Sequence, residues 1–574
     1  MVMDHDNDIA SLRTSTLNEL NESLFEEPMR QAIETSQVDF AQAGPVFTSP
    51  STSTFLSERA QLEKERRERQ ERHRKAQGFP LSDDERKEYD EEVEAGELPS
   101  VSDSRIDSGT TTTTSSSQKD TFFWNGERRP TATSGVTEPR KDERLTFNLS
   151  EVLGDKDDIA FAILSTFALN PSWIYGLFNP SVPVIMVTQP DSTGSASVKN
   201  VFPNWIKTTP SIQGGYDIVV HIFYKTGRLR VVVSTANLTP YDWEVIENAV
   251  WLQDILPRSN DDALKQPDEE SFECLMRRVL DNVNVESALS VMREQDQRNL
   301  PIGNTGDICT KWDWSNVAVK LVPSIAGKHE EWPSVILTGH TRLMKAVRDM
   351  GFRTGRWSRE QNLDLEYQGS SIGSYTTQWV NEFYHSAKGE SAEDWLDKPK
   401  RIRERLSYPT GLKVLYPTLE TVRSSQYGER GGQELFCNRS KWESPNFPRH
   451  LFYDSQSKAG RTLLHTKMIV SIVSSGRSTE FKNEDGKFKA TNADVGWAYL
   501  GSHNFTPSAW GMLSGSAFRP IMTIDNYELG IVFPLKSMAE ADQVACFERP
   551  PRKYGPNDTP WIRDESIYFK PSSP

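Results

Sequence analysis

Two segments of this chain, far apart in the sequence, carry the same pattern of residues. Residues 234–243 read STANLTPYDW and residues 502–511 read SHNFTPSAWG, so both contain a Ser, an Asn, an apolar residue, Thr-Pro and a Trp in that order. Each segment follows an apolar run typical of a β-strand, at 228–234 and 497–501. A repeated strand with a similar exit loop predicts a duplicated α/β unit, whose two copies pack together and bring their loops to one cleft.

A third segment, residues 463–470, places a histidine and a lysine on one side of a predicted strand. Alternate side chains of a strand share a face, so His465 and Lys467 point the same way. An imidazole that titrates near neutrality beside a cation suits chemistry on a phosphate, because one group moves a proton and the other holds negative charge. An H-x-K pair alone is common, and the alternative is a strand histidine beside a solvated lysine.

The chain from about residue 145 alternates apolar strands with helical stretches, which is typical of an α/β protein. We predict a helix over 157–169, a buried strand over 182–187, and two strands over 219–224 and 228–234 joined by the turn Lys225-Thr226-Gly227.

The length and charge set broad limits. The 574 residues are enough for several domains. Residues 1–150 hold 30 acidic and 19 basic residues, so −11 of the net charge of −15 lies there, and −4 remains for residues 151–574. A nearly neutral body is compatible with a local basic groove, so the total charge excludes no nucleic-acid partner.

The cysteines and the hydropathy pattern point to an intracellular protein. The four cysteines lie far apart, without paired spacing, and we interpret them as reduced thiols and expect no zinc site. We also expect no membrane span and no secretory signal, since there is no run of about 18 apolar residues and the N-terminus is acidic.

The first 140 residues are predicted to be mostly disordered, with an acidic tail over 1–45 and a charged, Ser/Thr-rich linker over 46–140. Within the tail, an acidic pair precedes four residues that share one narrow helical face, which are Met29, Ala32, Ile33 and Ser36. This resembles a ubiquitin-interacting motif and implies ubiquitin binding by these four residues. The alternative is a nascent amphipathic helix with no partner.

Residues 59–75 form a second charged island, with eight bases and four acids. Glu and Arg at helical spacing predict a solvated single helix, while a nuclear-import signal or a contact with a phosphate backbone stays open.

The ordered part of the chain, roughly residues 145–570, resembles the tyrosyl-DNA phosphodiesterase family, a branch of the phospholipase D superfamily. The resemblance is carried by separate matches in the right order. They are Leu229-Arg230-Val231-Val232 leading into Asn237, Asp242-Trp243, Ser370-Ser371-Ile372-Gly373 followed by Trp379, the His465 strand, Asn504 through Gly511, Tyr527-Glu528-Leu529-Gly530, and Pro560-Trp561-Ile562.

The resemblance implies a fold and an activity. The expected fold is α/β, with two similar phospholipase D-like α-β-α sandwich domains, 141–326 and 327–574, forming a pseudo-dimer behind the disordered tail. The implied activity is a metal-independent, cofactor-free removal of peptide or nucleoside adducts, notably tyrosine, from the 3′ ends of single- or double-stranded DNA. In such enzymes one histidine attacks phosphorus and the other serves as acid and then base. A nuclear monomer is expected.

The resemblance also assigns roles to residues of this chain. His465 matches the general acid/base, and Lys467 and Asn504 match its phosphate-binding partners. Glu528 matches the carboxylate that orients the site, and Asn237 matches the asparagine of the first half. Three residues match substrate-binding positions, which are Asn248, Ser370 and Ser371.

The first half departs from the family pattern at the expected H-x-K. Counting back from Asn237, the nucleophilic histidine falls at Asp217 and its lysine at Val219. An aspartate would bring negative charge to a phosphate pocket and a valine removes a cation, although a carboxylate can form an acyl phosphate in other enzymes. A four-residue slip that brings His221 into the cleft is the alternative.

Three hypotheses therefore stay open. The first is a divergent 3′-end phosphodiesterase that uses Asp217, His221 or a water activated by His465. The second is an inactive adaptor that binds DNA ends or ubiquitin, and the third is a phosphodiesterase with another substrate.

Overall fold

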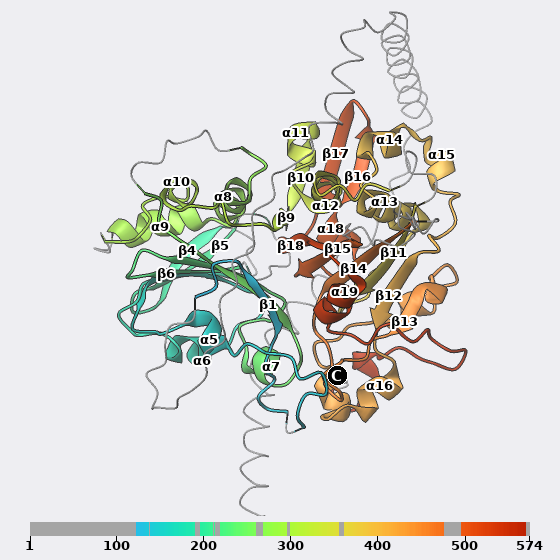
Figure 1. The fold of residues 1–574 in the computed structure, drawn as a ribbon, viewed down its shortest axis with the longest axis horizontal. Coiled ribbons are helices and arrows are strands. Elements are labelled where there is room, and N and C mark those ends of the chain that lie inside the picture. The colour runs from blue at the N-terminus through green and yellow to red at the C-terminus, as the bar shows by residue number, and fades with distance from the viewer. Residues whose placement is uncertain are drawn as a thin grey trace, which may run out of the picture. The chain divides into compact units, whose positions relative to one another are not determined.

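The computed structural model describes residues 122–136, 138–189, 196–210, 212, 219–259, 268–294, 299–354, 361–475 and 495–569. These residues form two large β-sheets, a small third sheet and the helices that cover them (Figure 1). The predicted α/β class and the two similar halves are confirmed.

The first large sheet has the strand order β1-β8-β7-β6-β2-β3-β5-β4. Its strands are β1 (Glu127–Pro130), β2 (Ile159–Ser165), β3 (Val184–Val187), β4 (Ser197–Phe202), β5 (Trp205–Thr209), β6 (Val219–Tyr224), β7 (Leu229–Ser234) and β8 (Ala249–Ile255).

The second large sheet has the order β13-β12-β11-β14-β15-β18-β9. Its strands are β9 (Lys320–Ser324), β11 (Gln361–Gln368), β12 (Leu412–Tyr416), β13 (Phe452–Asp454), β14 (Met468–Ser475), β15 (Gly496–Gly501) and β18 (Glu528–Leu535). The third sheet joins β10 (Gly327–Glu330), β17 (Arg519–Ile524) and β16 (Met512–Ser516).

The two large sheets repeat one topology. The run β5-β3-β2-β6-β7-β8 has the same parallel and antiparallel neighbours as β13-β12-β11-β14-β15-β18. A short helix with a Thr N-cap begins within each repeated segment: α7 (Pro240–Glu244) after Thr239 and α18 (Pro507–Trp510) after Thr506. The duplication predicted from the sequence is therefore present in the strand order itself.

The sequence comparison matches Ser234 with Ser502, but the backbone hydrogen bonds shift this alignment by one residue. Thr235 N donates to Ala249 O at 3.0 Å, and Ser502 N donates to Leu529 O at 3.0 Å. The hydroxyls of Thr235 and Ser502 in turn accept from the same two residues, at 3.0 and 2.9 Å. Thr235, not Ser234, is thus the counterpart of Ser502, and the two segments align without a gap.

Helices cover the outer faces of the sheets and fill the space between them. The outer face of the first sheet packs on α5 (Leu149–Leu153) and α6 (Pro171–Gly176), and that of the second on α12 (Gly339–Asp349) and α13 (Thr377–Ala387). The inner faces share one core with α8 (Phe272–Asn282) and α9 (Val285–Glu294). Since one apolar core serves both sheets, the halves form a single packed unit.

The remaining helices are short. They are α10 (Asp307–Lys311), α11 (Trp332–Val335), α14 (Ala392–Asp397), α15 (Lys400–Arg403), α16 (Leu419–Ser424), α17 (Arg439–Trp442), α19 (Met538–Val544), and the 3₁₀ turns η1 (Gly428–Gly432), η2 (Arg449–Leu451) and η3 (Arg563–Glu565). Within the described ranges no helix is long and apolar enough to cross a bilayer.

The helix predicted over 157–169 is wrong, because residues 159–165 form strand β2. This strand lies inside the sheet, parallel to β3 and antiparallel to β6, and both of its faces are covered. A strand buried on both faces reads as a continuous apolar run and shows no alternation, so its sequence resembles a buried helix.

The expected boundaries at 141 and 326 differ from the limits of the sheets. β1 lies before residue 141 but pairs with β8, so the end of the expected linker is ordered. β9 lies before residue 327 but pairs with β18 in the second sheet. In both cases the strand's backbone groups find partners at an open sheet edge, which sequence position alone does not determine.

Candidate active site

The site lies where the two halves meet. Glu247 N donates to Leu463 O at 2.9 Å and His465 N donates to Glu247 O at 2.9 Å, which forms a short parallel bridge between the halves. The Glu247 carboxylate is buried and pairs with Arg140 at 2.8 Å. This bridge places the His465 side chain against residues of the first half.

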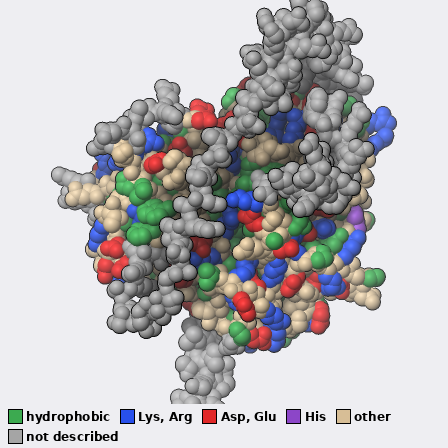
Figure 2. Space-filling model, viewed as in Figure 1, with side chains coloured by type: hydrophobic (Ala, Val, Ile, Leu, Met, Phe, Trp, Pro, Cys, Tyr) green, Lys and Arg blue, Asp and Glu red, His purple; other side chains and the backbone are tan. Residues whose placement is uncertain are grey.

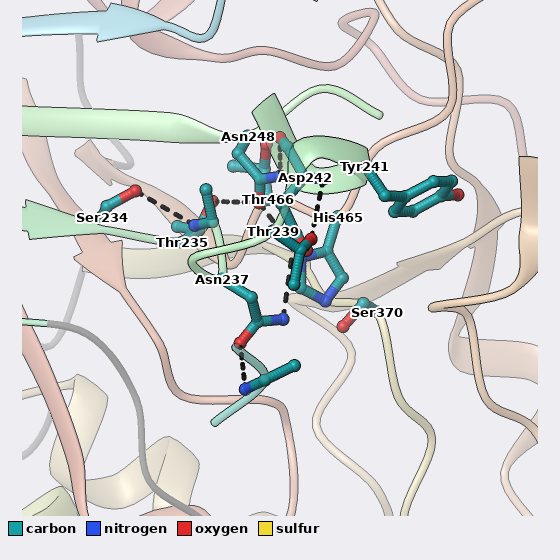
Figure 3. Close-up of polar contacts among 12 residues, drawn as sticks. Ser234, Thr235, Asn237, Thr239, Tyr241, Asp242, Asn248, Ser370, His465 and Thr466 are labelled. Atoms are coloured by element: carbon teal, nitrogen blue, oxygen red, sulfur yellow. Dashed lines mark hydrogen bonds and ion pairs between the residues drawn. The ribbon is translucent and has the colours of Figure 1, made fainter. Parts of the chain in front are cut away.

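His465 is held by oxygen atoms on one side of its ring. Its Nδ1 lies 3.1 Å from Asp242 Oδ1 and 3.1 Å from Asn248 Oδ1 (Figure 3). The Asn248 amide is itself oriented, because its Oδ1 accepts from Thr235 Oγ1 at 2.8 Å and its Nδ2 donates to Asp242 O at 2.9 Å. Asp242 and Asn248 both present acceptors to Nδ1, which favours the tautomer with the ring proton on Nδ1.

Lys467 and His465 lie in the segment that leads into β14, which begins at Met468, so the strand predicted over 463–470 starts later than expected and neither residue is within it. Lys467 Nζ is 2.9 Å from His465 Nε2 and 3.1 Å from Nδ1, and it also reaches Thr235 O at 3.4 Å. An ammonium only donates, so Lys467 favours a ring that keeps one lone pair, and with the proton on Nδ1 that lone pair is on Nε2. The imidazole is thus neutral, with its basic nitrogen on Nε2.

The surroundings of His465 favour this neutral form. Burial and the nearby Lys467 cation lower the pKa of His465 below its ordinary value, while Asp242 acts in the opposite direction. Burial alone would raise the pKa of the Asp242 carboxyl, but its hydrogen bonds with His465 and Thr239 lower it, so the carboxylate is ionised. A neutral imidazole beside a fixed carboxylate can accept a proton from a water or hydroxyl group.

Asp242 is a site residue to which the sequence assigned no role. It is fully buried, and its carboxylate accepts a hydrogen bond from Thr239 Oγ1 at 2.7 Å. The same carboxylate lies between His465 and Asn237, whose Nδ2 is 3.5 Å from Asp242 Oδ1 (Figure 3). The signal was present in Thr239-Pro240-Tyr241-Asp242, since a Thr N-cap followed by an acid in the first turn fixes the direction of that acid. The gap-free alignment places Ala509 at the same position of the second half.

The two repeated asparagines brace the loops that leave the neighbouring strands. Asn237 Oδ1 accepts from Ala168 N at 3.2 Å. Asn504 Oδ1 accepts from the backbone amides of Ser370 and Ser371, both at 3.0 Å, and from the Ser370 hydroxyl at 3.3 Å. Through these bonds each asparagine connects two strand exits of its own half.

These contacts bear on the substrate-binding residues predicted at 370 and 371. Ser370 is buried and uses both its amide and its hydroxyl within the protein, whereas the Ser371 side chain is half-buried. DNA binding by Ser370 and Ser371 stays a prediction.

Glu528 is the counterpart of Asn248. It accepts from Ser502 Oγ at 2.6 Å and from Asn526 Nδ2 at 3.0 Å, as Asn248 accepts from Thr235. Glu528 also lines a cavity of about 20 Å³ together with Ser165, at the end of β2. In the structure Glu528 therefore lies beside the strand exit of the first half, whereas Asn248 lies beside His465.

The first half-site is described only in part. Asp217 lies outside the described residues, and Val219 begins β6 opposite Val233. In the gap-free alignment Val233 corresponds to Leu500, whose partner is Met468, so Val219 corresponds to Met468 and not to Lys467. Lys467 and His465 lie one and three residues before Met468. The residues one and three positions before Val219 are Ile218 and Tyr216, so these two take the places of the lysine and the histidine in the sequence.

His221 is not available as a replacement nucleophile. It pairs with Val231 and Ile163 inside the first sheet, and its side chain is fully buried. Neither ring nitrogen has a hydrogen-bond partner among the described residues, and burial lowers its pKa to about 3. The proposed four-residue slip is therefore wrong.

The described residues contain no group of three or more His, Cys, Asp or Glu side chains placed to hold a metal ion. The predicted ubiquitin-binding residues, Met29, Ala32, Ile33 and Ser36, lie outside the described residues.

The face shown in Figure 2 carries both signs of charge. Lys and Arg side chains are interspersed with Asp and Glu over the described elements of the second half. This agrees with the small net charge expected for the ordered part of the chain.

Comparison with known proteins identifies relatives. The family model "Tyrosyl-DNA phosphodiesterase" matches residues 130–562. Tyrosyl-DNA phosphodiesterase 1 of Arabidopsis thaliana is 27% identical over 403 residues, covering 66% of this chain and 58% of the relative. The probable tyrosyl-DNA phosphodiesterase of Caenorhabditis elegans is 23% identical over 459 residues, covering 76% of this chain and 88% of the relative.

Solved structures share the fold. A crystal structure of a mutant yeast tyrosyl-DNA phosphodiesterase has a TM-score of 0.50 at 14% identity, covering 76% of this chain and 99% of the other. At this identity the likeness establishes the fold alone. The chain spans a little over half, 58%, of the Arabidopsis relative.

Proposed function

We propose, from the premise that this chain belongs to the tyrosyl-DNA phosphodiesterase family, that it is a DNA-repair phosphodiesterase that acts on blocked 3′ ends of DNA. The first substrate to test is a DNA strand that carries a 3′-phosphotyrosine. The observation that carries the proposal is the buried cluster of His465, Lys467, Asp242 and Asn248 at the junction of the halves.

The chemistry of this cluster supports phosphate-ester cleavage. Asp242 and Asn248 favour the His465 tautomer with the proton on Nδ1 and the basic lone pair on Nε2, and the Lys467 ammonium lies beside the ring. A cation within hydrogen-bonding reach of the proton acceptor stabilises the charge that develops on phosphate oxygens in the transition state. Buried donors are worth more here than in water, because the surroundings are poorly polarisable.

The direct experiment measures release of tyrosine from a single strand bearing a 3′-phosphotyrosine. The wild type is compared with His465→Ala and, as a matched control, with His450→Ala, which removes an exposed imidazole beside Tyr408. The proposal predicts that turnover drops at least about 1,000-fold in His465→Ala, the scale of losing an essential acid or base, and stays unchanged in His450→Ala.

The second candidate is a catalytically inactive adaptor for DNA ends. It is favoured by one specific observation, which is that residues 211–220 contain no histidine and no lysine. An adaptor would bind the 3′-phosphotyrosyl strand without releasing tyrosine. Binding with no release in the wild type, and release after an H-x-K is introduced at 216 and 218, would favour the adaptor over the enzyme.

The N-terminal residues extend the proposal. Ubiquitin binding by the segment around Ala32 and Ser36 would bring the protein to ubiquitin-bearing material, and a nuclear location and a monomeric state fit repair of chromosomal ends. Titration of labelled ubiquitin into the full chain and into an Ala32→Arg variant tests the first point. No perturbation at near-millimolar ubiquitin would exclude it.

A further inference from the structure

We propose that this chain cleaves its substrate in a single displacement, in which a water molecule and not a protein side chain attacks phosphorus, and that this restricts it to esters with a phenolic leaving group. The inference rests on the proposed function, because it assumes that the site around His465 is catalytic. It differs from the two-step, two-histidine reaction that the family resemblance implies.

The two half-sites are chemically unequal. At the first half-site the sequence over 211–220 supplies neither histidine nor lysine, and His221 is enclosed in the sheet. At the second half-site both residues of the H-x-K pair are present, with Lys467 within 3.1 Å of both ring nitrogens of His465 and Asp242 beside Nδ1. The carboxylate is unequal too, since the position of Asp242 in one repeat is taken by Ala509 in the other.

The contacts of His465 suit a general base. Asp242 holds the proton on Nδ1 and stabilises the imidazolium that forms when Nε2 accepts a second proton. Asn248 fixes the ring plane from the same side. A bound phosphate competes for the Lys467 ammonium, and this frees the Nε2 lone pair for a water molecule.

The step balances without any other reactant. The water oxygen forms a bond to phosphorus and the bond from phosphorus to the leaving oxygen breaks, with its electron pair going to that oxygen. One water proton passes to His465 Nε2. The leaving phenolate then takes that proton, which returns His465 to its neutral form and leaves a 3′-phosphate and a free phenol.

The use of one histidine limits the leaving group. While Nε2 accepts the water proton it cannot also protonate the departing oxygen, so the leaving group must depart as an anion. A tyrosine phenolate, with a pKa of about 10, does so readily, whereas an alkoxide is far more basic. We therefore expect cleavage of 3′-phosphotyrosyl and other aryl esters, and very slow cleavage of 3′ alkyl esters such as phosphoglycolate.

The decisive experiment reads the configuration at phosphorus. A single diastereomer of thymidine 3′-(4-nitrophenyl phosphorothioate) is hydrolysed by the full chain in ¹⁸O-labelled water, and the configuration of the product is read by ³¹P NMR. One displacement inverts the configuration and is the expected result. Retention, or a nucleotide adduct on any residue, Asp217 included, in the acid-quenched protein would overturn the inference while leaving the proposed function in place.

A leaving-group series tests the restriction. We expect 3′-phosphotyrosyl and 3′-nitrophenyl esters to be cleaved at least about 1,000-fold faster than the 3′-methyl ester. Comparable rates would overturn the restriction to phenols. Absence of turnover on every aryl ester would overturn the proposed function together with this inference.

Asp242→Asn tests the positioning role of the carboxylate. The change keeps the shape of the side chain and is expected to lower kcat by about 10- to 100-fold, with KM within about threefold, and to move the acid limb of the pH profile to lower pH. Thermal melting checks that the variant is folded. An unchanged kcat and pH profile in a folded variant would overturn the role of Asp242 in activating His465.

Discussion

At the scale of single residues, the environment of each histidine decides what it can do. His465 and His221 are both buried, and burial lowers the pKa of both. His465 has a carboxylate beside Nδ1 and a lysine close to both ring nitrogens, whereas His221 has no hydrogen-bond partner among the described residues. The first is equipped to exchange a proton and the second is not.

The pKa of His465 should move in opposite directions when its two charged neighbours are removed. Lys467 lowers this pKa and Asp242 raises it, so Lys467→Met is expected to raise it and Asp242→Asn to lower it further. NMR titration of the histidine ring protons between pH 4 and 8 measures both, with His465→Gln identifying the signal. Shifts of the same sign in the two variants would contradict this account of the site.

His221 should make the protein sensitive to acid. Its folded pKa of about 3 lies below the unfolded value of 6.5, so the unfolded chain binds the proton first. The stabilising contribution is complete above pH 6.5 and falls as the pH drops toward 3, by about 1.4 kcal/mol per pH unit.

Replacing His221 with valine, the residue at the matching position 470, should remove that sensitivity. Between pH 7 and 5 we expect the variant to gain about 2 kcal/mol relative to the wild type in the free energy of unfolding by urea. A difference that does not change with pH would show that His221 is not the group that titrates.

At the scale of elements, close packing of β15 and β18 determines which residues fit. A Cβ atom on Gly530 would overlap the ring of Tyr499, a fully buried residue whose hydroxyl bonds to His503, the neighbour of Asn504. By contrast, a Cβ on Gly176, at the end of α6, would meet nothing within 4 Å.

Gly530→Ala should therefore destabilise the protein by about 2 kcal/mol, the usual cost of overpacking a core. Gly176→Ala serves as the control and should leave stability unchanged or slightly higher, because alanine favours the helix. Urea denaturation of both variants measures the difference. Equal stability of the two would argue against the tight contact between these strands.

At the scale of the whole molecule, the segment from Phe122 to Phe147 connects both halves. Within it β1 pairs with β8, Arg140 binds Glu247 in the first half, and Lys141 N donates to Ala459 O in the second at 3.2 Å. Phe147 is fully buried. This segment therefore supports the junction where His465 is held.

Two truncations test the contribution of this segment. Removing residues 1–121 deletes none of these contacts and should leave the melting temperature within about 2 °C of the full chain. Removing residues 1–147 deletes all of them and should lower it by about 5 °C or more, with loss of activity. An unchanged melting temperature after the longer truncation would show that the junction does not depend on the segment.

Much of this protein follows from its sequence. The repeated Asn-x-Thr-Pro segments predicted two like halves, and the H-x-K pattern identified His465 and Lys467 as a pair, although both precede β14 and do not lie within a strand. Comparison of the two repeats in the sequence also showed that the first half lacks an H-x-K, because the residue at each position is known without a structure.

The tertiary structure decided what local patterns cannot specify. Residues 159–165 form a strand because the sheet covers both of its faces, and the register aligned Thr235 with Ser502 because backbone hydrogen bonds set the pairing. Above all, His465 received Asp242 and Asn248 as partners from the other half. Those contacts exist only where two surfaces, distant in sequence, are packed against each other.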